Sequence, residues 1–344
     1  MTITRLILSF VAFCIGIILV IPAVIVMLPF WLVAVASKVS NKLKPRISTW
    51  EDIIQYDSKL GWRAKPNVNV HMNTDGIYHM TTGKDGWRGQ YEIEKCNTIV
   101  IGDSFVFGQG TDEQNHFACL AKVARVKPVG APGYGVTHYL LLLKTLTHEL
   151  KDKLVIWFVY TGNDYRESIR PSSYGYHFPF VFRNAETRAW EIRTDHITEK
   201  KLPFHFEKGY NTSIPELADL FSENYLSDYA FGAFEYLVTE AKNHCDSHGS
   251  KFLVVTLPIR WLIEGSYVHK IKRHASLPEH FSVHYPDDQA EAICKNLDIP
   301  FRACLPDFVR EDFLPNDLHW SSTGNAKMAK IIDDLYETFL KTKT

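Results

Sequence analysis

Short, nearly continuous runs of apolar residues recur along the chain from residue 97 onward, separated by stretches with helical spacing. The apolar runs predict strands at 98–101, 126–129, 154–160 and 252–257, with a possible fifth at 299–302. Helical spacing is present at 112–125, 137–150, 228–247, 287–296 and 323–340. Strands without polar alternation are typical of sheets covered on both faces. The pattern therefore predicts an α/β fold: a doubly wound parallel sheet of about five strands, flanked by helices in three layers.

A different pattern opens the chain, because residues 6–36 contain no Lys, Arg, Asp or Glu. The apolar run 6–37 is longer than the roughly 20 residues of one membrane span and shorter than two full spans. Pro22 and Pro29 interrupt it, which leaves open one long tilted helix or a re-entrant hairpin. The run also exceeds the roughly 7 to 15 apolar residues of a cleaved signal peptide. We therefore expect residues 1–46 to be an anchor that contacts the lipid bilayer through residues 6–37.

The basic residues that flank the apolar run bear on the side of the membrane. Only Arg5 and the amino terminus precede the run, whereas Lys38, Lys42, Lys44 and Arg46 follow it. The positive-inside rule favours a cytoplasmic location for the domain that follows. A hairpin would keep both flanks on one side, so the sequence leaves the side of the membrane open.

The remainder of the chain divides by composition. Residues 47–96 are rich in glycine-containing turns and predict a β-rich lead-in. Residues 97–344 carry the alternating pattern of the α/β domain, interrupted at 166–225 by an aromatic-rich insertion with little periodicity. We expect this insertion to lie over the carboxyl edge of the sheet, where insertions often shape binding sites. Its aromatic residues more often serve packing than a sugar-binding platform.

Composition and charge narrow the function classes. The chain has 38 basic and 39 acidic side chains, a net charge of −1 and 46% hydrophobic residues. This balance excludes a dominant nucleic-acid-binding surface and wholesale disorder. The six cysteines lie at irregular spacings without a zinc-binding pattern. Cys294 and Cys304 could pair in an oxidising compartment, although buried reduced thiols are the simpler interpretation.

The first candidate for chemistry is Ser104, in the stretch Asn97–Gly110 (NTIVIGDSFVFGQG). This serine follows a predicted strand, at the carboxyl edge of a parallel sheet, where a nucleophile would be placed. Backbone N–H groups at the start of the following helix could stabilise an oxyanion there. The alternative is that Asp103 and Ser104 only satisfy a turn and cap the helix.

Three later segments carry a matching polar or glycine element after a strand or near the carboxyl end. They are Gly130–Gly135 (GAPGYG), Thr161–Asp164 (TGND) and Asn316–Trp320 (NDLHW). In this order and context the set resembles the SGNH (GDSL-type) hydrolase superfamily, over residues 97–340 apart from the insertion. The lead-in segments 56–67 (YDSKLGWRAKPN) and 86–89 (GWRG) are similar to those of membrane-associated bacterial members.

The resemblance implies a role for each matching residue. Ser104 corresponds to the nucleophile and donates one oxyanion hydrogen bond through its backbone N–H. Gly133 and Asn163 correspond to the second and third oxyanion donors. His319 corresponds to the general base, and Asp317 is the candidate carboxylate that orients it. Such a site needs neither a metal nor a cofactor.

Two further carboxylates, Asp103 and Asp164, are expected to support the site through local hydrogen bonds. One feature departs from the family pattern, which is most often Asp-x-x-His. Here Asn316 lies three residues before His319, and Asp317 lies two residues before it. His319 could therefore lean on Asp317 in altered geometry or on a backbone carbonyl. We expect Asp317, because an acidic group favours the imidazolium that forms during attack.

The sequence thus predicts a serine ester hydrolase that acts on an acylated glycan or a lipid ester through an acyl-enzyme. The same site could transfer the acyl group to a sugar hydroxyl, as an O-acyltransferase. A catalytically silent module that binds a glycan in the cleft is the alternative from another class. No nucleic-acid partner is expected.

Overall fold

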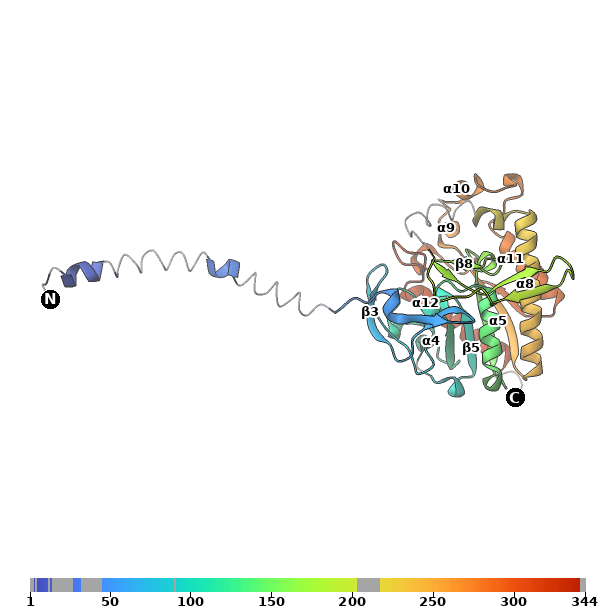
Figure 1. The fold of residues 1–344 in the computed structure, drawn as a ribbon, viewed down its shortest axis with the longest axis horizontal. Coiled ribbons are helices and arrows are strands. Elements are labelled where there is room, and N and C mark those ends of the chain that lie inside the picture. The colour runs from blue at the N-terminus through green and yellow to red at the C-terminus, as the bar shows by residue number, and fades with distance from the viewer. Residues whose placement is uncertain are drawn as a thin grey trace. The chain divides into compact units, whose positions relative to one another are not determined.

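The computed structural model describes residues 3, 5–11, 13, 27–31, 45–89, 91–202, 217–265 and 267–340. The chain divides into two units, residues 1–46 and residues 47–344, and Figure 1 shows the described elements as ribbons. Most of the predicted membrane segment, including Pro22, lies outside the described residues. Among the helices within the described ranges, none combines the length and the apolar character of a membrane span.

A five-stranded parallel sheet forms the centre of residues 47–344, in the order β13-β12-β7-β5-β6. Its strands are β5 (Thr98–Gly102), β6 (Val126–Gly130), β7 (Leu154–Tyr160), β12 (Lys251–Leu257) and β13 (Phe301–Ala303). Every residue of β5, β6 and β7 is buried, so both faces of the sheet are covered. The predicted α/β class and the strands predicted at 98–101, 126–129, 154–160 and 252–257 are confirmed.

The order of these strands contains one reversal of direction. The chain passes from β5 to β6 on one side and then returns to β7 on the other side of β5. In doubly wound sheets, ligands bind beyond the carboxyl ends of the strands at such a switch point. We therefore expect a binding site at the loops that follow β5 and β7.

The larger helices pack in two groups against the sheet. Helices α5 (Val136–Thr145), α8 (Tyr225–Ser247) and α11 (Tyr285–Asn296) pack on one another in that order, and α12 (Ser322–Phe339) packs on α4 (Phe117–Leu120). Figure 1 shows α5 beside the long α8. These helices agree with the predicted segments 137–150, 228–247, 287–296 and 323–340.

The helix predicted at 112–125 is wrong. This segment contains only a 3₁₀ turn, η2 (Glu113–Asn115), and the single turn of α4. The backbone N–H groups of Lys122, Val123 and Ala124 all donate to the carboxylate of Asp333 in α12, at 2.8–3.0 Å. A side chain from the far end of the chain thus takes the hydrogen-bonding groups that a longer helix would use.

Residues 47–96, expected to be a β-rich lead-in, contain two antiparallel hairpins. The first pairs β1 (Ile54–Asp57) with β2 (Gly61–Ala64), and the second pairs β3 (Asn69–Asn73) with β4 (Ile77–Thr81). The short helices α2 (Trp50–Ile53) and η1 (Ile93–Lys95) flank them. The second hairpin is fixed to the core, because the N–H groups of His79 and Thr81 donate to Asp112 and Glu113 at 2.7 and 3.2 Å.

The insertion also forms hairpins. It pairs β8 (Ser172–Ser173) with β9 (Tyr176–His177), and β10 (Phe180–Arg183) with β11 (Trp190–Arg193). Residues 203–216 of the insertion lie outside the described residues. The other short elements are α3 (Ser104–Phe107), η3 (Thr147–Glu149), α6 (Asp164–Glu167), η4 (Asp219–Phe221), α9 (Arg260–Ile263), α10 (Val268–Lys272), η5 (Pro278–His280) and η6 (Arg310–Asp312).

Cys294 and Cys304 are both buried and carry free thiols. Burial raises the pKa of each thiol to about 12, so both stay protonated at neutral pH. The pairing that the sequence left open is therefore not formed.

Candidate active site

Ser104 begins the short helix α3 (Ser104–Phe107), directly after β5. Asp103 caps this helix: its Oδ1 accepts the backbone N–H of Phe105 at 2.9 Å, and its Oδ2 lies 3.1 Å from Ser104 Oγ. Asp103 is buried, and this burial raises the pKa of its carboxyl group. Asp103 thus caps the helix, as one interpretation of the sequence had it. Ser104 lies at the carboxyl edge of the sheet and is not needed for this cap.

A chain of hydrogen bonds runs from Ser104 through His319 to Asp317. Ser104 Oγ lies 2.7 Å from His319 Nε2, although the two residues are 215 positions apart. On the other side of the ring, His319 Nδ1 makes a hydrogen bond to Asp317 Oδ1. The same oxygen accepts the backbone N–H of His319 at 2.9 Å. The candidate nucleophile, base and orienting carboxylate therefore have the connectivity of a catalytic triad.

The protonation of Asp317 fixes the direction of these hydrogen bonds. Burial alone would raise the pKa of Asp317, but hydrogen bonds from the His319 side chain and backbone hold it below its usual value. An ionised carboxylate only accepts hydrogen bonds, so the ring proton of His319 is on Nδ1. Nε2 is then the acceptor, and the Ser104 hydroxyl can donate to it.

Asn316 occupies the position where the family pattern most often has aspartate, but it faces a different partner. Its backbone N–H donates to Asp75 Oδ2 at 2.6 Å, and its Nδ2 donates to Asp75 Oδ1 at 2.9 Å. Asp75 lies in the turn between β3 and β4. Asp317, two residues before His319, is the residue of this segment that contacts the His319 ring.

The segment that carries Asp317 is also held from α9. Arg260 Nη1 donates to the carbonyl oxygens of Leu314 and Asp317 at 2.8 and 2.7 Å, and Nη2 donates to that of Pro315 at 2.7 Å. Its Nε pairs with Glu264 at 2.7 Å. The planar guanidinium thus binds three carbonyl groups around the orienting carboxylate.

The two other predicted oxyanion donors follow the strands on either side of β5. Gly133 follows β6, and Asn163 follows β7. Gly133 has a φ of 79°, and a Cβ there would lie 2.8 Å from the Tyr174 ring. Only glycine suits this position, because the backbone is left-handed and a neighbouring ring covers it. Ser104, Gly133 and Asn163 therefore come from three adjacent strand ends of the sheet.

The insertion reaches these oxyanion positions through the tip of its β8–β9 hairpin. Tyr174 lies at this tip with a φ of 51°, and the Asn163 amide donates to its hydroxyl at 3.4 Å. Its ring covers Gly133. A left-handed tyrosine is strained, so its surroundings must hold it there.

Asp164 is buried beneath the site. Its Oδ2 accepts the Tyr139 hydroxyl at 2.6 Å and the backbone N–H of Tyr160 at 2.7 Å. Burial and, secondarily, the charge of Asp103 raise the pKa of Asp164 well above its usual range. These contacts tie the loop after β7 to α5, as expected of a supporting residue.

The lead-in contacts the loop that carries Gly133. Trp62 Nε1 donates to the carbonyl of Pro132 at 3.1 Å, and His138 Nε2 lies 3.2 Å from the carbonyl oxygen of Leu60. Trp62 belongs to the lead-in segment 56–67, for which the sequence alone indicated no role. Its hydrogen bond to Pro132 shows that this segment supports the loop that carries Gly133.

A second lead-in residue, Arg88, supports the segment after Ser104. It is 2% exposed, and its guanidinium donates to the carbonyl oxygens of Phe107, Gly108 and Thr111 at 2.7–3.1 Å. Its Nε donates to Glu113 at 3.1 Å. Lead-in residues thus hold each of the three segments that carry Ser104, Gly133 and Asp317.

Asp75 and Arg260 were missed from the sequence. Asp75 lies 241 positions from its partner Asn316, and Arg260 lies 57 positions from its partner Asp317. No local spacing signals such contacts. The asparagine at position 316, where the Asp-x-x-His pattern has aspartate, was the one sign in the sequence that other residues hold this segment.

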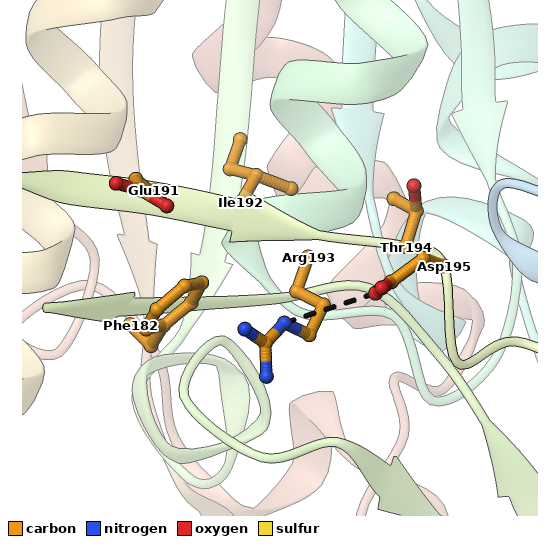
Figure 2. Close-up of a pocket in the computed structure, with 6 residues that line it drawn as sticks. All are labelled: Phe182, Glu191, Ile192, Arg193, Thr194 and Asp195. Carbon is orange, nitrogen blue, oxygen red and sulfur yellow. Dashed lines mark ion pairs between the residues drawn. The ribbon is translucent and has the colours of Figure 1, made fainter. Parts of the chain in front are cut away.

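Two hollows lie outside this site. One is lined by His269, Lys272, Arg273 and Pro278, and the other lies along the β10–β11 hairpin. Figure 2 shows the second, where Arg193 pairs with Asp195 at 3.7 Å and its guanidinium lies over the Phe182 ring. Across the ranges that the structure describes, no cluster of three or more His, Cys, Asp or Glu side chains is placed to hold a metal ion.

Comparisons with known proteins give similarity of chain trace alone. No protein-family model matches the chain, and no curated protein matches it in sequence. Solved structures with a similar trace include a carbohydrate acetylesterase from Sinorhizobium meliloti, at 15% identity and a TM-score of 0.39, covering 70% of this chain and 99% of the other. Another is an inhibitor-bound aryl esterase from M. smegmatis, at 13% identity and a TM-score of 0.39, covering 71% and 100%. Similarity at this level assigns no chemistry to this chain.

Proposed function

We propose that this chain is a serine esterase of the SGNH type. The observation that carries the proposal is the hydrogen-bonded series Ser104–His319–Asp317, with 2.7 Å between Ser104 Oγ and His319 Nε2. A serine hydroxyl is a poor nucleophile until a neighbouring base takes its proton during attack, and an aligned imidazole does this. The motif set that resembles the superfamily supports the same assignment.

In the proposed reaction, Ser104 Oγ bonds to the ester carbonyl carbon while its proton moves to His319 Nε2. The carbonyl oxygen becomes an oxyanion, for which the N–H groups of Ser104 and Gly133 and the amide of Asn163 are the donors. Collapse breaks the ester C–O bond, and the alcohol leaves with the proton from His319. Water, deprotonated by His319, then attacks the acyl-enzyme and releases the acid.

The substrate class we propose is an acylated glycan or a lipid ester. The charge-free run 6–36 would hold the domain near a membrane, where both classes are concentrated. Membrane attachment through residues 6–37 is itself part of the proposal. Extraction of membranes at alkaline pH tests it: the full chain should stay with the lipid, and release into the supernatant would contradict the anchor.

Labelling with a fluorophosphonate tests the enzymatic part of the proposal. The wild type should be labelled and should hydrolyse p-nitrophenyl acetate, whereas Ser104→Ala and His319→Ala should do neither. Ser58→Ala, at an exposed lead-in position, is the matched control and should behave as the wild type. A folded wild type that neither labels nor turns over would contradict the esterase and favour the silent binding module.

A further inference from the structure

The β3–β4 hairpin of the lead-in contributes one side chain to the segment that orients the candidate base. Asp75, in the turn of this hairpin, accepts both the backbone N–H and the side-chain amide of Asn316, at 2.6 and 2.9 Å. The hairpin is not a loose tip, because Asp112 and Glu113 accept backbone N–H groups from β4. Asp75 therefore presents a fixed carboxylate to the segment before His319.

The contact with Asp75 holds Asn316 away from His319 and leaves Asp317 as the partner of the ring. Asn316 has both of its donor groups on Asp75, whereas the next residue, Asp317, accepts from both the backbone and the ring of His319. The same segment is bound on its carbonyl side by Arg260. The amide of Asn316 thus faces Asp75, and the carboxylate of Asp317 faces His319.

We propose that Asp75 is a positioning residue: by binding Asn316 it directs Asp317 to His319, which makes the β3–β4 hairpin part of the catalytic apparatus. This inference rests on the proposed esterase function. It also gives the lead-in a role in activity, beyond covering the sheet. Asp75 touches neither the nucleophile nor the base, so its effect passes through the segment that carries Asp317.

The test compares four variants of the full chain. Asp75→Ala removes the acceptor, and Asn316→Asp sets two carboxylates against each other. The exchange Asp75→Asn with Asn316→Asp restores both hydrogen bonds, because an amide at 75 can accept the backbone N–H and donate to a carboxylate at 316. Asp246→Ala is the control, since Asp246 is an exposed carboxylate in α8 that pairs with Lys242 at 2.6 Å.

We expect Asp75→Ala to lower kcat roughly ten- to hundredfold with KM nearly unchanged, because misplacement of a base by about 1 Å costs up to that much. Asn316→Asp should lower kcat at least as far. The exchange should bring kcat back to within about threefold of the wild type, a recovery of the kind that a double-mutant cycle measures. Asp246→Ala should leave kcat unchanged.

A second measurement does not depend on activity. The ¹⁵N shifts of His319, assigned by their loss in His319→Gln, report which ring nitrogen carries the proton. The proton should be on Nδ1 in the wild type and in the exchange variant, and should be shared between both nitrogens in Asp75→Ala. Should Asp75→Ala fail to fold, Asp75→Asn, which keeps one acceptor, takes its place with a smaller loss.

The outcomes separate this inference from the esterase assignment. A wild type without turnover contradicts the esterase, while the ring proton of His319 still tests the positioning by Asp75. Folded Asp75→Ala with unchanged kcat and an unchanged ring proton would overturn the inference. So would an exchange variant as impaired as Asn316→Asp alone.

Discussion

The hydroxyl of Tyr134 donates a hydrogen bond of 2.5 Å to the backbone carbonyl of Trp62. The Trp62 indole returns a hydrogen bond to the carbonyl of Pro132, one residue before Gly133. Both aromatic side chains are buried. The lead-in and the loop after β6 are therefore one packed unit, and the position of the Gly133 N–H depends on both.

Replacing Trp62 with Phe tests this dependence. The variant keeps an aromatic ring but loses the hydrogen bond to Pro132, which stabilises by about 1 kcal/mol. We expect kcat to fall a few-fold and the free energy of unfolding to fall by about 1 kcal/mol, both measured on the purified chain. Trp190→Phe, in the β10–β11 hairpin, is the control for ring replacement. Equal kcat in the two variants would argue against the coupling.

Asn163 provides a test of the oxyanion site. Asn163→Ala removes a side-chain donor, and the loss of one such donor typically lowers kcat by about 10²- to 10³-fold. KM should change much less, because the donor acts on charge that develops in the transition state. Asn184→Ala, in the turn of the β10–β11 hairpin, should leave kcat unchanged. A decrease confined to KM would contradict the oxyanion role.

Arg260 and Arg310 form a matched pair for the segment before His319. Both bind the carbonyl of Pro315, but only Arg260 also binds the carbonyl of Asp317. We expect Arg260→Lys to lower kcat about tenfold, because lysine cannot hold several carbonyl groups in one plane. Arg310→Lys should lower it less than twofold, by steady-state kinetics. The reverse order would show that Asp317 is held in another way.

Much of the sheet could be predicted because buried parallel strands leave a local mark. The seven residues of β7 are all buried, and the apolar run 154–160 matches its bounds. Ile299, in contrast, lies outside β13, because its N–H closes the end of α11 on Cys294 at 2.8 Å. The helix prediction for 112–125 was wrong because Asp333, over 200 positions away, accepts the backbone N–H groups of residues 122–124.

The site shows the same division between local and distant causes. Ser104 could be named because it follows a strand that the apolar pattern marks, and the resemblance to the superfamily then implied Gly133 and Asn163. Asp75 and Arg260 leave no such mark, since their roles arise only when the β3–β4 hairpin and α9 meet the segment 314–317. The departure at Asn316 becomes intelligible only with Asp75 in place.

His138 links stability to pH in the unit that supports Gly133. Burial lowers the pKa of His138 to about 3, whereas an unfolded histidine titrates near 6.5. Its contribution to stability is present above about pH 6.5 and is lost as the pH falls toward 3, at about 1.4 kcal/mol per pH unit. Urea unfolding of the wild type should therefore show a steeper acid loss than His138→Gln.

The exposed His280 gives the control for this pH dependence. His280→Gln should keep the wild-type slope of unfolding free energy against pH. Equal slopes for the wild type and His138→Gln would show that His138 is not held neutral by its buried site. Activity should be followed in parallel, because we expect protonation of His138 at low pH to disturb the loop that carries Gly133.

The most direct measurement of the central claim is mass spectrometry of the protein quenched rapidly during turnover of p-nitrophenyl acetate. An activated Ser104 beside His319 predicts one acetyl group per chain, located on the peptide that contains Ser104, and an equal burst of p-nitrophenol. Ser104→Ala should show neither. Turnover without an adduct on Ser104, or an adduct on another residue, would contradict the account.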